Sequence, residues 1–491
     1  MSLPRFQSYI DGAFEDGEST FESIDPSTGR AWAIMPAATA HDVDRAVRAA
    51  HRAFNDSSWA NLTATARGAL LNRLGDLVAE HSQRLAELET RDTGKIIRET
   101  RAQIGYVANY YRYFGGLADK VEGASLPVDK PDMEAFLRRE PIGVVAAVVP
   151  WNSQLFLSAV KLGPALAAGC TVVLKASEDG PAPLLEFAKL IDEAGFPKGV
   201  VNIITGFGDP CGKVLTSHPL VARVAFTGGP STARQVVRNT AENLAYTTLE
   251  LGGKSPVVVF ADADLDSAAN AIVAGIFAAS GQSCVAGSRL LVERSVHDQL
   301  LDILARKARS IRIGDPQDPA TEMGPLATRR QLEHIERVVA QSVANEAKLI
   351  VGGRRGEDST GGFYYEPTIL DCSSNDVPCV REELFGPVLS VLSFEDEADA
   401  VAQANDSAFG LAAGVFTTNL TRAHRLIRRI RAGVVWVNTY RAVSPIVPFG
   451  GYGLSGLGRE GGSESILDYT RVKAVWIRTS DEPIGDPFIM R

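Results

Sequence analysis

The feature that most constrains the fold of this chain is the alternation of short, continuous apolar runs with helical segments. The run Val144-Val-Ala-Ala-Val-Val149 contains no polar residue, as is typical of a strand covered on both faces. Similar runs recur between segments with helical periodicity. Strands that alternate with helices at this spacing form parallel sheets with crossover helices. The chain is therefore predicted to be an α/β protein.

Two such series follow each other along the 491 residues. At roughly 150 residues per domain, this length allows two or three domains. The apolar periodicity predicts helices over residues 41–56, 63–92, 97–120, 155–168, 182–194, 231–240, 296–310, 328–344, 397–405 and 420–430. Apolar runs predict strands at 144–149, 171–175, 200–204, 223–227, 255–260, 288–292, 349–351, 388–392, 412–416 and 434–437, and residues 136–141 form an extended segment.

Composition excludes several classes of protein. A net charge of −9 without a basic stripe argues against nucleic acid or an anionic membrane as partner. The longest apolar stretch, 142–151, has about half the length that spans a bilayer, and no signal peptide precedes it, so a cytoplasmic location is expected. The five cysteines include no Cys-x-x-Cys pair, so neither a disulfide framework nor a metal site is expected.

One cysteine and one glutamate stand in conspicuous surroundings. Cys284 lies in the run Gly281-Gln-Ser-Cys-Val-Ala-Gly287, and Glu250 lies in Leu249-Glu-Leu-Gly-Gly-Lys254, close to the join between the two series. Small residues around a thiol let backbone N–H groups approach an oxyanion. A carboxylate with a raised pKa can act as a general base. An isolated cysteine is more often a small buried hydrophobe, but this combination favours covalent catalysis through a thioester.

Glycines at the end of a predicted strand indicate a phosphate site. In Phe226-Thr-Gly-Gly-Pro-Ser231 a strand ends and a helix begins, which brings free N–H groups and the positive end of a helix dipole together. A second strand end carries Lys175-Ala-Ser-Glu178, whose charged side chains suit ribose hydroxyls. The segment Gly451-Tyr-Gly-Leu-Ser-Gly456 has the glycine spacing of the dinucleotide-binding motif. No strand leads into it, so it is predicted to be a structural loop.

These residues belong to a set of motifs that resembles the NAD(P)-dependent aldehyde dehydrogenase superfamily over nearly the whole chain. The shared motifs are Pro150-Trp-Asn152, Lys161-Leu-Gly-Pro-Ala-Leu-Ala-Ala-Gly169, Lys175-Ala-Ser-Glu178, Phe226-Thr-Gly228, Glu250-Leu-Gly-Gly-Lys254, Gly281-Gln-Ser-Cys284, Glu382-Glu-Leu-Phe-Gly-Pro387, Pro448-Phe-Gly-Gly451 and Gly458-Arg-Glu460.

The resemblance implies a mechanism. Cys284 attacks the aldehyde, Asn152 and the Cys284 backbone N–H hold the oxyanion, hydride passes to the nicotinamide, and Glu250 activates the water that hydrolyses the thioester. Lys161 and Glu460 resemble an auxiliary proton-relay pair, with a surface or helix-cap charge as the alternative. A coenzyme-A-acylating enzyme and a non-catalytic binding protein on the same scaffold remain alternatives. The presence of Glu250 argues against the first, and retention of all three central residues argues against the second.

The resemblance also implies a nicotinamide cofactor. Its predicted binding residues are Trp151, Lys175, Glu178, Gly208, Phe226, Thr227, Gly228, Gly229, Ser231, Leu251, Gly252, Glu383 and Phe385. A carboxylate at Glu178 repels a 2′-phosphate and accepts hydrogen bonds from a free 2′-hydroxyl, which favours NAD over NADP. Gly229 and Pro230 depart from the family pattern, so a phosphate-contacting hydroxyl is lost or displaced to Ser231.

A substrate tunnel is implied by the same alignment. Its predicted walls are Tyr106, Tyr110, Ser153, Leu157, Val160, Ser283, Val285, Val443 and Phe449. Arg441 lies where the tunnel opens, and either attracts a carboxylate-bearing aldehyde or is a solvated loop charge.

The expected architecture is a Rossmann-like NAD-binding domain (1–120 and 142–253), a second α/β catalytic domain (254–451), and a small β oligomerisation arm with a C-terminal strand and tail (121–141 and 466–491). Residues 469–477 resemble a strand with nothing in its own domain to pair with. An unpaired strand is a liability unless another subunit covers it, so a homodimer or homotetramer is expected.

Overall fold

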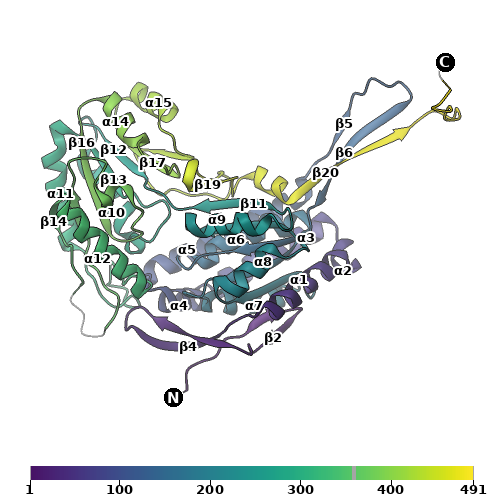
Figure 1. The fold of residues 1–491 in the computed structure, drawn as a ribbon, viewed down its shortest axis with the longest axis horizontal. Helices are drawn as coiled ribbons and strands as arrows, with labels where there is room; N and C mark the ends of the chain where they lie inside the picture. Colours follow the sequence, from purple (N-terminus) through teal and green to yellow (C-terminus); the bar gives the residue numbers. More distant parts are fainter. Residues whose placement is uncertain (1, 357–360, 490–491) are drawn as a thin grey trace.

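The computed structural model describes residues 2–356 and 361–489. Residues 1, 357–360 and 490–491, which fall in the predicted NAD-binding domain, catalytic domain and tail, lie outside the described residues. Two large sheets with helices on both faces form the body, and a narrow three-stranded arm projects from it (Figure 1). The α/β prediction is confirmed.

The first sheet has the strand order β19-β11-β10-β7-β8-β9-β1-β2. Its five central strands are parallel, whereas β19 and the β1–β2 hairpin pair antiparallel at the edges. The strands are β1 (Ser8–Ile10), β2 (Ala13–Glu15), β7 (Val144–Val148), β8 (Thr171–Ala176), β9 (Val201–Thr205), β10 (Val221–Gly228), β11 (Tyr246–Leu251) and β19 (Gly456–Leu457). A separate hairpin consists of β3 (Thr20–Asp25) and β4 (Arg30–Pro36).

Helices cover both faces of this sheet, as the apolar runs predicted. In β7, Val145 and Ala147 belong to one core cluster, whereas Val144 and Ala146 belong to the cluster on the opposite face. The helices are α1 (Ala40–Asn55), α2 (Ser57–Ala60), α3 (Ala64–Glu80), α4 (Ser82–Thr93), α5 (Ile97–Leu117), α6 (Gln154–Ala168), α7 (Ala182–Ala194), α8 (Lys213–Ser217) and α9 (Pro230–Thr240).

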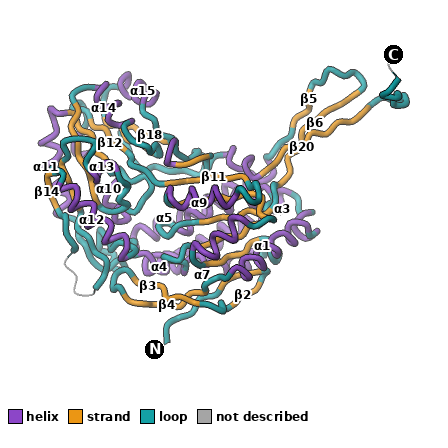
Figure 2. The backbone as a smooth tube through the Cα atoms, viewed as in Figure 1, coloured by secondary structure: helices purple, strands orange, loops and turns teal. Residues whose placement is uncertain are grey.

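The second sheet has the order β14-β15-β16-β13-β12-β17-β18 and is parallel except for β14. Its strands are β12 (Pro256–Val259), β13 (Arg289–Glu293), β14 (Lys348–Val351), β15 (Thr368–Asp371), β16 (Val388–Phe394), β17 (Ala412–Phe416) and β18 (Val434–Val437). Its helices are α10 (Leu265–Phe277), α11 (His297–Ser310), α12 (Arg329–Ala344), α13 (Pro378–Arg381), α14 (Glu397–Asn405) and α15 (Leu420–Arg429). Figure 2 shows the same alternation of helices and strands in both bodies.

Two predictions about elements were wrong. The predicted helix 63–92 is two helices, because the backbone at His81 (φ −93°, ψ 11°) departs from helical values and ends α3. The predicted strand 469–477 is β20 (Thr470–Arg478), and it is not unpartnered: it pairs antiparallel with β6 (Met133–Pro141) along its whole length, and β5 (Ala124–Leu126) completes the arm.

No helix in the described part of the chain is long and apolar enough to cross a membrane. The cytoplasmic location and the domain boundaries stay predictions.

Candidate active site

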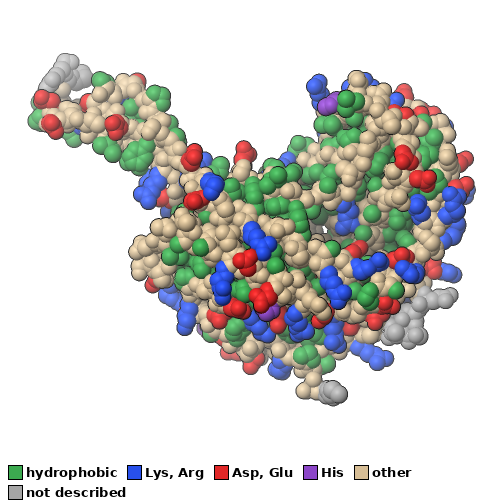
Figure 3. All heavy atoms as spheres, turned by 180° about the vertical axis from the view of Figure 1, so that it is seen from behind, with side chains coloured by type: hydrophobic (Ala, Val, Ile, Leu, Met, Phe, Trp, Pro, Cys, Tyr) green, Lys and Arg blue, Asp and Glu red, His purple; other side chains and the backbone are tan. Residues whose placement is uncertain are grey.

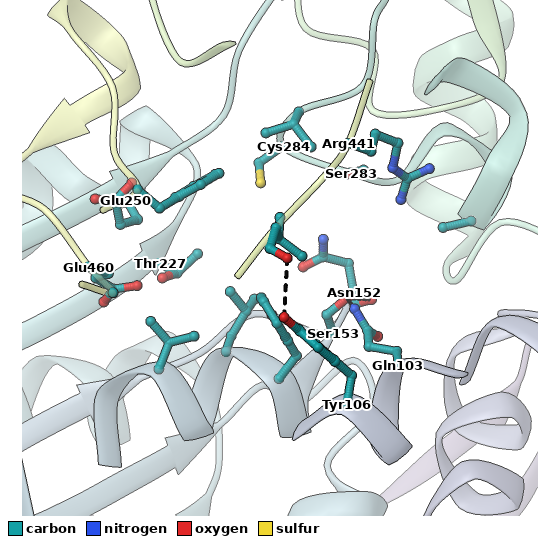
Figure 4. Close-up of a pocket in the computed structure, with 18 of the residues that line it drawn as sticks. Gln103, Tyr106, Asn152, Ser153, Thr227, Glu250, Ser283, Cys284, Arg441 and Glu460 are labelled. Carbon is teal, nitrogen blue, oxygen red and sulfur yellow. Dashed lines mark hydrogen bonds between the residues drawn. The ribbon is translucent and has the colours of Figure 1, made fainter. Parts of the chain in front are cut away.

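Residues from both sheets enclose one cavity of about 500 Å³ (Figure 4). Cys284, Glu250 and Asn152, which are far apart in sequence, all line it. The other predicted residues in its wall are Tyr106, Tyr110, Ser153, Leu157, Val160, Thr227, Leu251, Ser283, Val285, Arg441, Val443, Phe449 and Glu460. Every predicted substrate residue is among them. Thr227 and Leu251, predicted to contact the cofactor, are in the wall of this cavity as well.

A tight turn after α10 carries the thiol into the cavity. Ala279, Ser280 and Gly281 have positive φ angles of 52°, 53° and 74°, which is rare for two consecutive residues other than glycine. A Cβ at Gly281 would lie 2.0 Å from the carbonyl oxygen of Gly386, so only glycine fits there. The turn leads directly into Cys284.

The resting side chain of Cys284 is a neutral thiol. Burial raises its pKa to about 12, and the nearby carboxylates of Glu383 and Glu250 act in the same direction, while the charge of Arg441 opposes them. Attack on a carbonyl therefore requires a step that removes the thiol proton.

The carboxyl group of Glu250 is buried at the end of β11, and neither of its oxygens has a hydrogen-bond partner among the described residues. Burial raises its pKa well above the ordinary value, and the adjacent charge of Glu460 adds to this effect. Gly450 leaves the space that this carboxyl occupies, because a Cβ there would lie 2.7 Å from Glu250 Oε1. Such a group has free lone pairs for a water molecule.

Lys161 and Glu460 form a buried ion pair behind Glu250. Lys161 is fully buried in the middle of α6, and its Nζ donates to Glu460 and to Thr227 Oγ1 at 2.6 Å. The alternative of a surface or helix-cap charge was therefore wrong. This pair supplies protonatable groups next to Glu250.

Asn152 lies between β7 and α6, and its amide reaches the loop that carries the thiol. Its Nδ2 donates to the carbonyl oxygen of Gln282 at 3.0 Å. The Ser153 hydroxyl donates to the backbone carbonyl oxygen of Asn152 at 2.6 Å. The bond to Gln282 holds the side-chain amide against the loop that carries Cys284, where it can serve as an oxyanion donor.

Five polar residues of the cavity wall were missed in the sequence: Lys95, Glu99, Gln103, Gln282 and Ser444. Lys95 Nζ donates to Glu89 Oε1 at 2.9 Å, Gln103 Oε1 at 2.8 Å and Ser153 Oγ at 3.0 Å. A signal existed, because Glu99 and Gln103 continue, at helical spacing, the face of α5 that bears the predicted tyrosines.

Of the remaining predicted cofactor residues, several are described by their contacts. Lys175 Nζ lies 3.4 Å from Glu178 Oε2. Glu383 Oε1 accepts the Gly253 N–H at 3.0 Å, and burial raises the pKa of this carboxyl to about 7. A Cβ at Gly252 would lie 2.0 Å from the same carboxylate. Both acidic residues can accept hydrogen bonds from ribose hydroxyls.

The predicted cofactor glycines differ in how much space surrounds their backbone. A Cβ at Gly208 or Gly229 would meet nothing within 4 Å, so the backbone there is open to a ligand. A Cβ at Gly228 would lie 2.5 Å from the Phe226 ring, so that glycine serves internal packing. Gly229 is the N-cap of α9 without a side-chain cap, which leaves N–H groups near Ser231 free for a diphosphate. Trp151 packs edge-on against Phe385, with ring centroids 5.5 Å apart. The residues present fit a dinucleotide.

Comparisons with known proteins identify the family. A model of the aldehyde dehydrogenase family matches residues 14–475. A curated relative from Acinetobacter baylyi, named (Z)-2-((N-methylformamido)methylene)-5-hydroxybutyrolactone dehydrogenase, is 64% identical over 490 residues and covers 100% of both chains. The chain belongs to the aldehyde dehydrogenase family.

Solved structures of this family are closely similar. The NAD⁺ complex of an aldehyde dehydrogenase from Bacillus cereus is 39% identical, with a TM-score of 0.95 over 97% of each chain. PnpE from Pseudomonas sp. WBC-3, in complex with nicotinamide adenine dinucleotide, is 43% identical, with a TM-score of 0.95 over 98% of this chain and 99% of the other.

Proposed function

We propose that the protein oxidises an aldehyde to a carboxylic acid through a thioester on Cys284, with NAD as the hydride acceptor. The observation that carries this proposal is the convergence in one cavity of a thiol, a buried carboxyl with both oxygens free, and a side-chain amide. Family membership supports the same reaction class.

Each of the three central residues has its own role in the proposed reaction. The Cys284 thiol loses its proton and its sulfur bonds to the aldehyde carbon, while Asn152 Nδ2 and the Cys284 backbone N–H stabilise the oxyanion. When NAD is bound, it accepts the hydride that leaves this carbon, and the thioester remains. Glu250 then takes a proton from water as the water attacks the thioester. Collapse of that adduct releases the acid and the Cys284 thiolate, so that one proton, the one taken from water, leaves the site in each turnover.

The buried pair of Lys161 and Glu460 serves as a relay in this proposal. Glu250 has no hydrogen-bond partner within the described ranges 2–356 and 361–489, and the charges of Lys161 and Glu460 act on it. A proton taken from water can leave the cavity through Glu460, whose carboxylate is held in place by Lys161. This path keeps Glu250 available for the next turnover.

We propose that the predicted cofactor residues, from Lys175 to Phe385, form the cofactor site. Glu178 and Glu383 accept hydrogen bonds from the ribose hydroxyls, and the open backbone at Gly208 and Gly229 accommodates the diphosphate. The carboxylate of Glu178 repels a 2′-phosphate, so we propose NAD rather than NADP.

The substrate is proposed to be an aldehyde that also carries a carboxylate. The Acinetobacter relative is named for a 5-hydroxybutyrolactone, and such a hydroxylactone is the ring form of a 4-oxo acid. Ring opening gives the free aldehyde that a thiol attacks, together with a carboxylate. The polar groups in the cavity wall suit a substrate of this kind.

The experiment follows NADH absorbance with a panel of aliphatic, aromatic and 4-oxo-acid aldehydes, without coenzyme A. Wild-type protein forms NADH and the free acid, whereas Cys284→Ala forms neither and still binds NAD. A requirement for coenzyme A identifies an acylating enzyme instead. NAD binding without oxidation of any aldehyde identifies a binding protein on this scaffold.

A further inference from the structure

Two cationic side chains line the cavity, and they differ in how far their hydrogen-bonding capacity is used. Lys95 donates to three acceptors, one of them the carboxylate of Glu89, with which it forms a buried ion pair. Arg441 donates one hydrogen bond, from Nη1 to the Ala274 carbonyl oxygen at 3.0 Å, and has no ion-pair partner among residues 2–356 and 361–489. A guanidinium has five N–H donors, so most of those on Arg441 are available to a ligand.

The backbone that carries Arg441 is held firmly on both sides. Tyr440 donates its hydroxyl to the Val285 carbonyl oxygen at 2.9 Å, and Trp436 Nε1 donates to the Ala442 carbonyl oxygen at 3.0 Å. Arg441 itself has a positive φ of 63°, a conformation that is uncommon for residues with a side chain and clusters at functional sites. Because Val285 directly follows the catalytic cysteine, the Tyr440 bond sets the position of Arg441 relative to the thiol.

Three glycines make room for the Tyr440 ring. A Cβ would lie 2.9 Å from this ring at Gly275, 3.3 Å at Gly287 and 2.7 Å at Gly414. The ring is therefore enclosed by backbone from α10, from the segment after Cys284 and from β17. Such enclosure fixes the backbone from which the Arg441 side chain starts, and a preorganised group loses less entropy on binding.

Arg441 and Cys284 line the same cavity. Figure 4 shows Arg441 beside Ser283 and on the Cys284 side of the cavity. Its charge acts on Cys284 and on the buried carboxyl of Glu99. Both oxygens of Glu99 accept the Ala279 N–H, at 3.0 and 2.9 Å, so that carboxyl serves the turn before Cys284.

We propose that Arg441 binds the carboxylate of the substrate through charge-assisted hydrogen bonds and so selects the open-chain form of a 4-oxo acid over its uncharged hydroxylactone. This inference rests on the proposed oxidation of an aldehyde at Cys284. A 4-oxo acid carries its aldehyde and its carboxylate on one short chain, and the cavity wall carries both a thiol and a guanidinium. Planar guanidinium groups bind carboxylates in a bidentate manner, which fixes orientation as well as charge.

The first test uses wild-type protein alone. The probes are 4-oxobutanoate and its methyl ester, which present the same aldehyde with and without the negative charge. We expect kcat/KM for the acid to exceed that for the ester by about 10- to 100-fold, chiefly through KM, as for a substrate held by a charge-assisted hydrogen bond. Equal values for the two probes would overturn the proposal.

The second test uses variants. Arg441→Met should lower the acid-to-ester ratio of kcat/KM by about 10- to 100-fold, and Arg441→Lys, which keeps the charge but not the planar fork, should give an intermediate ratio. Arg428→Met, at an exposed position of α15, is the matched control and should keep the wild-type ratio. A fall in both probes by the same factor in Arg441→Met would assign the residue to the structure of the loop and refute the proposal.

The two proposals can fail separately. If wild-type protein oxidises neither these probes nor any other aldehyde, both the proposed function and this inference are overturned. If it oxidises both probes with equal kcat/KM, the dehydrogenase remains and only the role of Arg441 is lost.

Discussion

At the scale of single residues, the proposed catalytic groups stand out by a missing hydrogen-bond partner and a missing charge. Glu250 is buried without a hydrogen-bond partner in the described chain, and Cys284 is a neutral thiol at rest. A buried polar group without a partner is unfavourable for stability, so the unpaired Glu250 carboxyl in the cavity wall marks a site shaped for chemistry.

Glu250→Gln should separate the two halves of the reaction. An amide cannot take a proton from water, so we expect a burst of about one NADH per site and then a steady-state rate lowered about 10²- to 10⁴-fold. Stopped-flow absorbance with quenched detection of the thioester measures this. Steady turnover at the wild-type rate would contradict the assignment.

The pH dependence of the wild-type enzyme provides a related check. The pKa of Glu250 is raised, so the basic form appears only above that raised value. The rate of thioester hydrolysis should therefore rise with pH through a range above the ordinary glutamate pKa of about 4.3, and fall as the carboxyl is protonated. This rise should be missing in Glu250→Gln.

Glu178→Gln tests the choice of cofactor. Removing the negative charge next to Lys175 should relieve repulsion of a 2′-phosphate and lower the NAD-to-NADP ratio of kcat/KM by about tenfold. Glu122→Gln, an exposed position in the connection before the arm, is the control. An unchanged ratio in steady-state kinetics would remove Glu178 from the specificity argument.

At the scale of elements, strand ends and short edge pairings position the site. The Gly451–Gly456 segment, predicted to be structural, leads into β19, whose Gly456 pairs with Glu250 of β11. It thus supports the strand that carries the general base rather than a phosphate. Sequence periodicity identified most of the long elements, but it missed helix α10 and strand β11. It missed β19 because two residues have no period, and it missed the break at His81 because no glycine or proline marks it.

Gly456→Ala should damage both stability and catalysis. Gly456 has a φ of 135°, and a Cβ there would lie 1.9 Å from the Leu249 carbonyl oxygen. We expect unfolding free energy to fall by about 1–3 kcal/mol and turnover to decrease as β11 shifts. Thermal unfolding and kcat measure the two effects. Gly485→Ala, where a Cβ meets nothing within 4 Å, should change neither.

At the scale of the whole molecule, the projecting arm exposes apolar side chains that nothing in the described chain covers. Figure 3 shows hydrophobic side chains gathered on it. Leu126, Val472, Trp476 and Ile477 are each at least 40% exposed, and β20 forms an edge of the arm sheet. An exposed apolar edge strand is a surface for association. The homodimer or homotetramer therefore stays our prediction, although β20 has a partner within its own chain.

Trp476→Glu should weaken this association. The introduced charge opposes burial of the exposed face of β20, so we expect the measured mass to move toward that of the monomer at micromolar concentration. Sedimentation velocity or light scattering measures it. Val343→Glu, a half-exposed position on α12, is the control. A wild-type mass in Trp476→Glu would place the interface elsewhere.

The sequence predicted most of the elements and the principal reactive groups, because strand and helix periods are local and because thiol, carboxyl and amide groups keep their identity in any fold. The tertiary structure alone decided the protonation of Glu250, the burial of the Lys161–Glu460 pair, the pairing of β20 with β6 and the free donors of Arg441. These properties depend on which distant segments exclude water from a group and which supply its partners. Neither is encoded in the residue's own neighbourhood.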